Sequence, residues 1–316
     1  DLAGAEALGD LINAGTEEQR AQSVRLMDGA LHRRCEAWRD DLLRAVALIE
    51  VTIDWADEEV PEDVVPEVSQ LVGGLIASMA DELGRSDMAE RIRTGFEIAL
   101  LGAPNVGKSS LFNYLADREA AITSPDAGTT RDVLELQYDL RGIPVTFLDM
   151  AGLRASDDPV EQEGVRRALD RGRSADLRLR LTSADAPFPD ALADPADAQD
   201  VVVSTKSDIG AAGRADTDFD VSTVTGEGIA ALTDAIFERL RHRVDRAGLL
   251  GHARQRAAAA DAIRSLEAAQ NRLHEAPVEI VAEDLRAALG ALGRLTGGTD
   301  VEAVLGEVFS RFCLGK

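Results

Sequence analysis

The chain has 316 residues, of which 45% are hydrophobic and 29% charged, and its formal net charge is -23 at pH 7. This length predicts a globular protein of roughly two domains. The acidic balance argues against broad electrostatic binding to nucleic acid or to an anionic membrane. Two cysteines and four separated histidines make neither a disulfide framework nor a zinc site, which indicates a reducing, cytoplasmic setting. We expect no membrane association, because no apolar run is long enough to span a bilayer.

The first third of the chain has the periodicity of helices. Apolar residues recur at helical spacing up to about residue 58 and again from Val64 to Met79, with a break at Val60-Pro61 and an end near Gly84. The helical period returns after about residue 244, over 257–273, 281–292 and 301–312. Each of these two blocks would expose an apolar face if it stood alone. We therefore predict that residues 1–95 and 244–316 form one discontinuous all-α bundle.

The middle of the chain has a different pattern. Short apolar runs alternate there with helix-like segments such as 226–242, which is typical of an α/β nucleotide-binding domain. The runs cover residues 96–101, 133–140, 143–148 and 200–204. We predict that this α/β domain, residues 96–243, is inserted between the two halves of the helical domain.

Residues 102–109 read Gly-Ala-Pro-Asn-Val-Gly-Lys-Ser, between a strand-like run and a helix-like stretch. In that context the backbone N–H groups and the helix dipole converge on phosphate oxygens, which favours a phosphate-binding loop over a chance glycine-rich turn. Lys108 can reach the β and γ phosphates, and the Ser109 hydroxyl is a candidate magnesium ligand. The predicted nucleoside triphosphate contacts are Asn105, Val106, Gly107, Lys108, Ser109 and Ser110.

Two further motifs complete the phosphate side of the site. Asp149-Met150-Ala151-Gly152 follows the run 143–148, so Asp149 is expected to face the magnesium ion and the Gly152 amide to approach the γ-phosphate. Residues 128–132 read Gly-Thr-Thr-Arg-Asp. A threonine there can complete the magnesium shell when the γ-phosphate is present, giving a switch. Thr130 is the preferred ligand and Thr129 the alternative, while each motif also has a plain structural reading as a turn.

Recognition of the base is predicted after the run 200–204, where Thr205-Lys206-Ser207-Asp208 stands. Asp208 can accept two hydrogen bonds from guanine N1 and N2, a pairing that adenine cannot reproduce, and Lys206 can lie along the base. GTPases usually have Asn at the first position, so Thr205 leaves open a weakened selectivity for guanine. A later loop, containing Ser222 and Thr223, is predicted to contact the guanine carbonyl through its backbone.

These residues together resemble the tRNA uridine-modifying GTPase family MnmE, also called TrmE, within the Era-like GTPases. The resemblance covers nearly the whole chain, and its most discriminating part is the terminal Phe-Cys-Leu-Gly-Lys at 312–316, because Era-like ribosome-assembly GTPases lack such a tail. It implies a Ras-like P-loop GTPase domain inserted into a helical bundle. The other matching segments are 1–20, 53–55, 104–111, 127–132 and 151–154.

The resemblance also implies how hydrolysis is catalysed. Leu153 stands where many small GTPases have a water-positioning Gln. The family uses a potassium ion in place of an arginine finger, held here by Asn105 and by the loop containing Ser124 and Thr129, when two GTPase domains meet face to face. The Glu that orients the attacking water matches Glu161. Glu163 is a rival, and for either the structural alternative is a carboxylate at a helix start.

The sequence predicts different roles for the two cysteines. A lone Cys313 on an apolar helical face would ordinarily be a packed core residue. Within the terminal pentapeptide, the resemblance instead implies that it is needed for tRNA modification, with Lys316 as the only nearby candidate base. Cys35 is expected to be structural.

One stretch departs from a normal buried strand. Residues 176–181 alternate Leu with Arg178 and Arg180. Two guanidiniums in a central strand need partners or solvent, since unpaired burial is costly. We expect either that one face of this strand is open or that the core is degraded.

The resemblance therefore implies a potassium-stimulated GTPase that uses Mg²⁺ and acts with the flavoprotein MnmG to modify C5 of the wobble uridine in certain tRNAs. A 5-formyltetrahydrofolate-type cofactor is implied only through the family's N-terminal domain, which we expect to lie outside residues 1–316. The full-length family protein is expected to be a homodimer or part of a heterotetramer. The alternative is an Era-like regulatory GTPase that times RNA binding or ribosome assembly.

Overall fold

The computed structural model describes residues 1–54, 64–117, 121–122, 134–150, 166–167, 170–189, 200–209 and 217–297. These residues fall into two compact units. Of the described residues, the helical unit contains 1–14, 19–54, 64–93 and 244–297, and the α/β unit contains 15–18 and those of 94–243. Within the described ranges, no helix has both the length and the apolar character needed to cross a bilayer.

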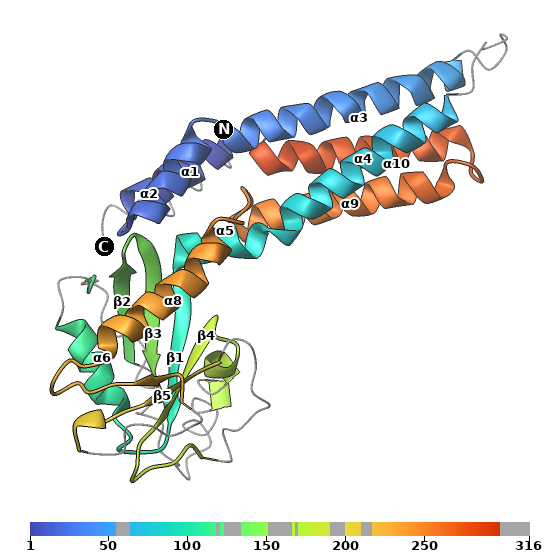
Figure 1. Cartoon of the computed structure of the whole chain (residues 1–316). Helices are drawn as coiled ribbons and strands as arrows, with labels where there is room; N and C mark the ends of the chain where they lie inside the picture. Colours follow the sequence, from blue (N-terminus) through green and yellow to red (C-terminus); the bar gives the residue numbers. More distant parts are fainter. Residues whose placement is uncertain are drawn as a thin grey trace. The chain divides into compact units, whose positions relative to one another are not determined.

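Four long helices form the body of the helical unit. They are α3 (Ala30–Asp54), α4 (Val65–Gly84), α9 (Ala253–Arg272) and α10 (Val278–Thr296), and they lie side by side (Figure 1). Their shared core includes Trp38, Leu75, Leu266 and Leu285, each buried. Since α3 and α4 come from the first third of the chain and α9 and α10 from the last, the predicted discontinuous bundle is confirmed.

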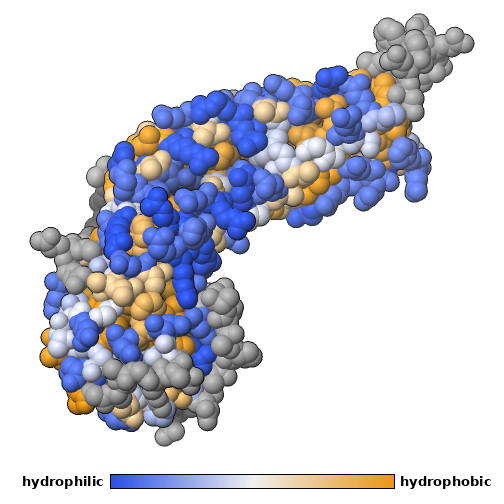
Figure 2. Space-filling view, in the orientation of Figure 1, coloured by the Kyte–Doolittle hydropathy of each residue, from blue (hydrophilic) through white to orange (hydrophobic). Residues whose placement is uncertain are grey.

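The described residues of this unit also form three shorter helices, and a local signal explains where the first of them begins. They are α1 (Leu2–Ile12), α2 (Glu17–Met27) and α5 (Ser86–Thr94). The Asp1 carboxylate accepts a hydrogen bond from the Gly4 N–H at 2.6 Å, which caps α1. Hydrophilic residues cover most of the visible face of the bundle, with smaller hydrophobic areas between them (Figure 2).

The α/β unit is built on one sheet with the strand order β2-β3-β1-β4-β5-β6. β2 is antiparallel to β3 and the remaining pairs are parallel. Because the carboxyl ends of parallel strands meet at one edge, the loops after β1, β3, β4 and β5 come together there. The strands are β1 (Phe96–Gly102), β2 (Leu134–Leu140), β3 (Ile143–Asp149), β4 (Leu177–Thr182), β5 (Asp200–Ser204) and β6 (Phe219–Asp220). Among the described residues, helices of this unit include α6 (Lys108–Ala116) and α8 (Ile229–Val244), with a 3-10 turn η3 (Ser207–Ile209).

The two arginines of β4 share a carboxylate partner, an arrangement that neither sequence-based alternative described. Arg178 pairs across the ladder with Asp200, the first residue of β5. One Asp200 carboxylate oxygen lies 2.5 Å from Arg178 Nε and the other lies 3.2 Å from Arg180 Nη1. The Arg180 guanidinium also lies 4.3 Å from the centre of the Phe188 ring. The face is therefore neither open nor degraded, because a shared carboxylate supplies the partner for both charges.

Candidate nucleotide site

The loop after β1 has the backbone of a phosphate cradle. Asn105 and Gly107 both have positive φ, 61° and 110°, so the chain wraps tightly before α6 begins at Lys108. At Gly102 a Cβ would lie 2.6 Å from the Leu181 carbonyl oxygen, so only glycine fits beside β4. The first N–H groups of α6 consequently face the space enclosed by the loop.

Lys108 is held inside this loop. Its Nζ donates to the carbonyl oxygens of Gly102 and Ala103, both at 2.8 Å, and the residue is buried. Burial lowers the pKa of Lys108, an effect that the nearby Asp149 carboxylate opposes. An anionic ligand at the loop would stabilise the charged form of this side chain.

The structure brings together two of the three proposed magnesium ligands. Ser109 Oγ donates to Asp149 Oδ2 at 2.9 Å, although the residues are 40 positions apart. Asp149 is buried at the end of β3, where it lies opposite Leu100 of β1. Oxygen donors from a hydroxyl and a carboxylate suit Mg²⁺, which usually takes one or two protein carboxylates and fills its other positions with water and phosphate. Among the described residues there is no cluster of three or more His, Cys, Asp or Glu side chains that could hold a metal ion.

In the segment predicted to recognise the base, a neighbouring loop orients the Asp208 side chain. Ser222 Oγ donates to Asp208 Oδ1 at 2.6 Å, and the N–H groups of Val224 and Thr225 both reach the same hydroxyl at 3.2 Å. The side chain of Ser222 thus joins the two predicted base-recognition loops. Sequence reasoning assigned Ser222 and Thr223 a backbone contact and missed this hydroxyl.

Thr205 also has a role that the sequence did not reveal. Its buried hydroxyl lies within hydrogen-bonding distance of two carbonyl oxygens, that of Val106 in the phosphate loop and that of Thr182 at the end of β4, the latter at 3.2 Å. A Cβ on Gly107 would meet Thr205 Oγ1 at 3.3 Å, so the two loops are in close contact. Thr205 therefore ties the base-recognition segment to the phosphate loop.

A second residue that sequence reasoning missed is Asp185, in the loop after β4. It accepts hydrogen bonds from Ser183 Oγ at 2.7 Å and from Lys206 Nζ at 3.1 Å. The Ser183 hydroxyl and then the Lys206 ammonium lower the pKa of the Asp185 carboxyl. Lys206 itself has a φ of 59°, so both its backbone and its side chain are constrained.

The remaining proposed site residues lie outside the described part of the chain. These are Ser124, Thr129, Thr130, Gly152, Glu161, its rival Glu163, and Cys313. Asn105 is the member of the proposed potassium set that the structure describes, and its side chain is exposed.

Comparison with known proteins places the chain in a family. The family model described as "MnmE helical domain" matches residues 2–313. The tRNA modification GTPase MnmE of Dinoroseobacter shibae is 53% identical over 317 residues, covering 100% of this chain and 72% of that protein. The MnmE of Cereibacter sphaeroides is 50% identical over 318 residues, with 100% and 73% covered. Among solved structures, Era of Aquifex aeolicus with GDP and aluminium fluoride is 26% identical, covering 45% of this chain and 56% of that chain, with a TM-score of 0.33. The chain thus belongs to the MnmE family of tRNA modification GTPases.

Proposed function

We propose that this chain is the helical and GTPase part, with boundaries 1–95, 96–243 and 244–316, of a potassium-stimulated GTPase of the cytoplasm. Together with the flavoprotein MnmG it modifies C5 of the wobble uridine of certain tRNAs, as a homodimer or within a heterotetramer. GTP hydrolysis drives a conformational change between states of the GTPase domains. The observation that supports this most directly is the contact between Ser109 and Asp149 beside the phosphate loop, within a chain of the MnmE family.

In this proposal the phosphate loop holds the triphosphate. The backbone of residues 105–110 and the Lys108 ammonium contact the β and γ phosphates, and the Gly152 amide approaches the γ-phosphate. Ser109, Thr130 and Asp149 hold Mg²⁺, which when bound neutralises charge on the phosphate oxygens. Asp208 accepts from guanine N1 and N2, and its orientation by Ser222 supports this role.

The proposed water-orienting group is Glu161, with Glu163 as the alternative. Asn105, Ser124 and Thr129 hold K⁺, which when bound supplies positive charge at the transferred phosphoryl group. An exposed Asn105 with left-handed backbone conformation at the mouth of the loop supports this assignment.

The rate of GTP hydrolysis in potassium and in sodium, at equal ionic strength, tests the potassium site. We expect hydrolysis to be about tenfold or more faster in potassium, because charge stabilisation of this kind is worth at least that much. Equal rates would reject the role of Asn105 while leaving GTP binding intact. Asn105→Ala should lose the potassium stimulation, and its control Asn113→Ala, which removes an exposed Asn from α6 outside the phosphate loop, should keep it.

We propose that the Cys313 thiol takes part in tRNA modification. The folate-type cofactor belongs to a preceding domain in the full-length protein. Cys35 is an unsuitable thiol, because burial raises its pKa to about 12 and it is 3% exposed. In the full-length protein, Cys313→Ser should abolish tRNA modification and keep GTP hydrolysis, whereas Cys35→Ala should keep both. Mass spectrometry of wobble uridine measures the outcome, and unchanged modification in Cys313→Ser would reject the thiol's role.

A further inference from the structure

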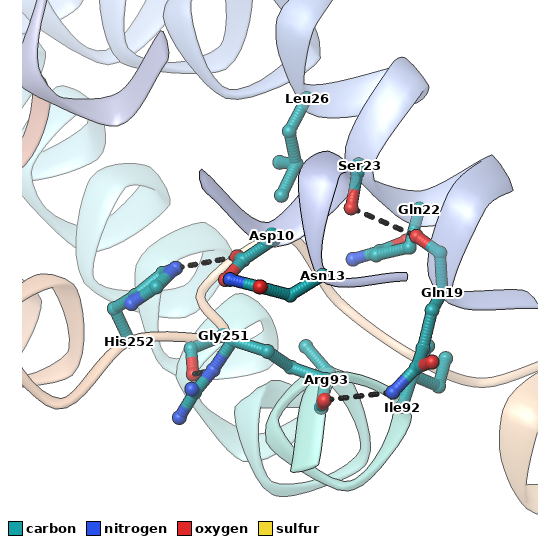
Figure 3. Close-up of a pocket in the computed structure, with 11 residues that line it drawn as sticks. Asp10, Asn13, Gln19, Gln22, Ser23, Leu26, Ile92, Arg93, Gly251 and His252 are labelled. Carbon is teal, nitrogen blue, oxygen red and sulfur yellow. Dashed lines mark hydrogen bonds and ion pairs between the residues drawn. The ribbon is translucent and has the colours of Figure 1, made fainter. Parts of the chain in front are cut away.

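The helical unit contains a pocket of about 280 Å³ (Figure 3). The chain passes between this unit and the α/β unit around residues 15–18, between 93 and 94, and between 243 and 244. The pocket walls come from residues that flank the passages on the helical side. They include Asp10, Asn13, Gln19, Gln22, Arg93 and His252.

Hydrogen bonds join these flanking segments to one another. Gln19 Nε2 donates to the Arg93 carbonyl oxygen at 3.0 Å, and Arg93 Nε donates to the Gly251 carbonyl oxygen at 3.3 Å. His252 Nε2 lies 2.8 Å from Asp10 Oδ2, as Figure 3 shows. We call Asp10, Gln19, Gln22, Arg93 and His252 the collar, because they connect the flanks of all three passages.

Gln22, in α2, is the collar residue that contacts the segment before α9. Its Nε2 donates to the Gly248 carbonyl oxygen at 3.0 Å. The same segment is anchored from the other side, since Gly248 N–H donates to the Arg85 carbonyl oxygen at 3.1 Å and Leu249 N–H donates to the Glu82 carboxylate. The segment leading into α9 is therefore held both by α2 and by the end of α4.

The bond between Asp10 and His252 is sheltered from water. Their side chains are 14% and 8% exposed, so the contact lies where hydrogen bonds are stronger than at an open surface. His252 immediately precedes α9 and Asp10 lies in α1. This contact fixes the start of α9 against the helix that precedes the first passage.

The second passage leads directly to the phosphate loop of the proposed nucleotide site. α5 ends at Thr94 and β1 begins at Phe96, and β1 runs without interruption to Gly102 at the start of the phosphate loop. A shift of β1 along its axis would therefore pull on Arg93, which the collar connects to Gly251 and so to the start of α9. A path of this kind consists of packed elements and hydrogen bonds, the physical basis of coupling between distant sites.

We propose that the collar couples the nucleotide state of this GTPase to the position of α9. In this proposal Asp10, Gln19, Gln22 and His252 are positioning residues that transmit the change to α9. The inference rests on the proposed function, because it requires GTP-dependent change in the α/β unit. It assigns no part in GTP binding or hydrolysis to these residues, which belong to the helical unit and not to the phosphate loop or the base-recognition loops.

Hydrogen exchange of α9 amides, Ala253–Arg272, with GDP and with a non-hydrolysable GTP analogue, tests the proposal. The parent protein should show a difference in exchange between the two nucleotides. Asp10→Ala should reduce that difference about fivefold or more, a change in the range of ordinary coupling energies, while GTP affinity stays unchanged. Asp10→Asn should preserve it, since the Asn carbonyl oxygen can still accept a hydrogen bond from the His252 ring.

Asp284→Ala is the matched control. Asp284 is 17% exposed and lies 2.7 Å from Arg272 in an ion pair that joins α9 to α10 away from the collar. This variant should keep the nucleotide-dependent difference. If Asp10→Ala unfolds, Gln22→Met removes only the bond to Gly248 and should show the same loss.

Three results would overturn the proposal. The first is an undiminished difference in Asp10→Ala or Gln22→Met, and the second is an equal loss in Asp284→Ala. The third is a parent protein that binds GTP but shows no difference in α9. A nucleotide titration of the same sample separates these from failure of the proposed function, which predicts GTP binding.

Discussion

Thr205 shows how one hydroxyl can join two loops of the proposed nucleotide site. By sequence it was a departure from the usual Asn of this motif. In the structure it lies between the carbonyl oxygens of Val106 and Thr182, and so joins the base-recognition segment to the phosphate loop and to β4. A threonine can do this because one hydroxyl donor close to the carbonyl oxygens is enough to join the segments.

We predict that Thr205→Val lowers the affinity for GDP and GTP about tenfold. The substitution keeps the shape of the side chain but leaves a buried carbonyl oxygen without its donor, which costs about 1–3 kcal/mol. Titration with a fluorescent guanine nucleotide measures the effect, and Thr205→Ser, which retains the hydroxyl, is the control. If Thr205→Val binds GDP and GTP as tightly as the parent protein, the Thr205 hydroxyl does not support nucleotide binding.

At the scale of elements, β4 and β5 are joined by charge as well as by backbone hydrogen bonds. The Asp200 carboxylate forms ion pairs with both Arg178 and Arg180, and its side chain is 6% exposed. Such a network contributes little compared with a well-packed apolar core, but removing its central carboxylate leaves two guanidiniums without their counter-charge. The Asp200 side chain therefore adds to the backbone hydrogen bonds that set the register of β5 against β4.

Asp200→Ala should lower the free energy of unfolding of the α/β unit by about 3 kcal/mol, the cost of breaking a buried ion pair from one side. Urea denaturation followed by circular dichroism measures this change. Asp170→Ala, which removes an exposed carboxylate beside Arg173, should leave stability nearly unchanged. A similarly small loss in Asp200→Ala would mean that water compensates the two arginines.

At the scale of the whole molecule, the chain is organised as two units with separate cores. The bundle core is contributed by both ends of the sequence, whereas the proposed nucleotide site lies entirely within the α/β unit. A ligand that binds one unit stabilises that unit by mass action. The two units should therefore respond differently to nucleotide.

Calorimetry should resolve this difference. With Mg²⁺ and GDP at about a hundred times its dissociation constant, the α/β unit should gain about 2.7 kcal/mol, and each kcal/mol corresponds to a rise of about 2–4 °C in its Tm. The transition of the helical unit should move less. A single transition that shifts as a whole would show that the two units unfold together.

Much of the fold could be predicted from the sequence because its signals are local. The periods of apolar residues located β1, β2, β3 and β5 to within about two residues of their bounds, and the loop from Gly102 to Ser109 was predicted with its flanking strand and helix. The discontinuous bundle followed from the need of both helical blocks to bury an apolar face. Helix starts were less accurate, since α9 begins at Ala253, before the apolar period does.

The spacing of motifs along the chain was enough to predict the GTPase domain and to propose which side chains bind phosphate, because each motif is a short contiguous segment with its own geometry. Tertiary structure alone decided how Arg178 and Arg180 are neutralised, what Thr205 holds and which residues form the collar. Each of these depends on groups that are far apart in sequence, such as Asp10 and His252. Only folding brings such groups within hydrogen-bonding distance, so no local pattern could reveal them.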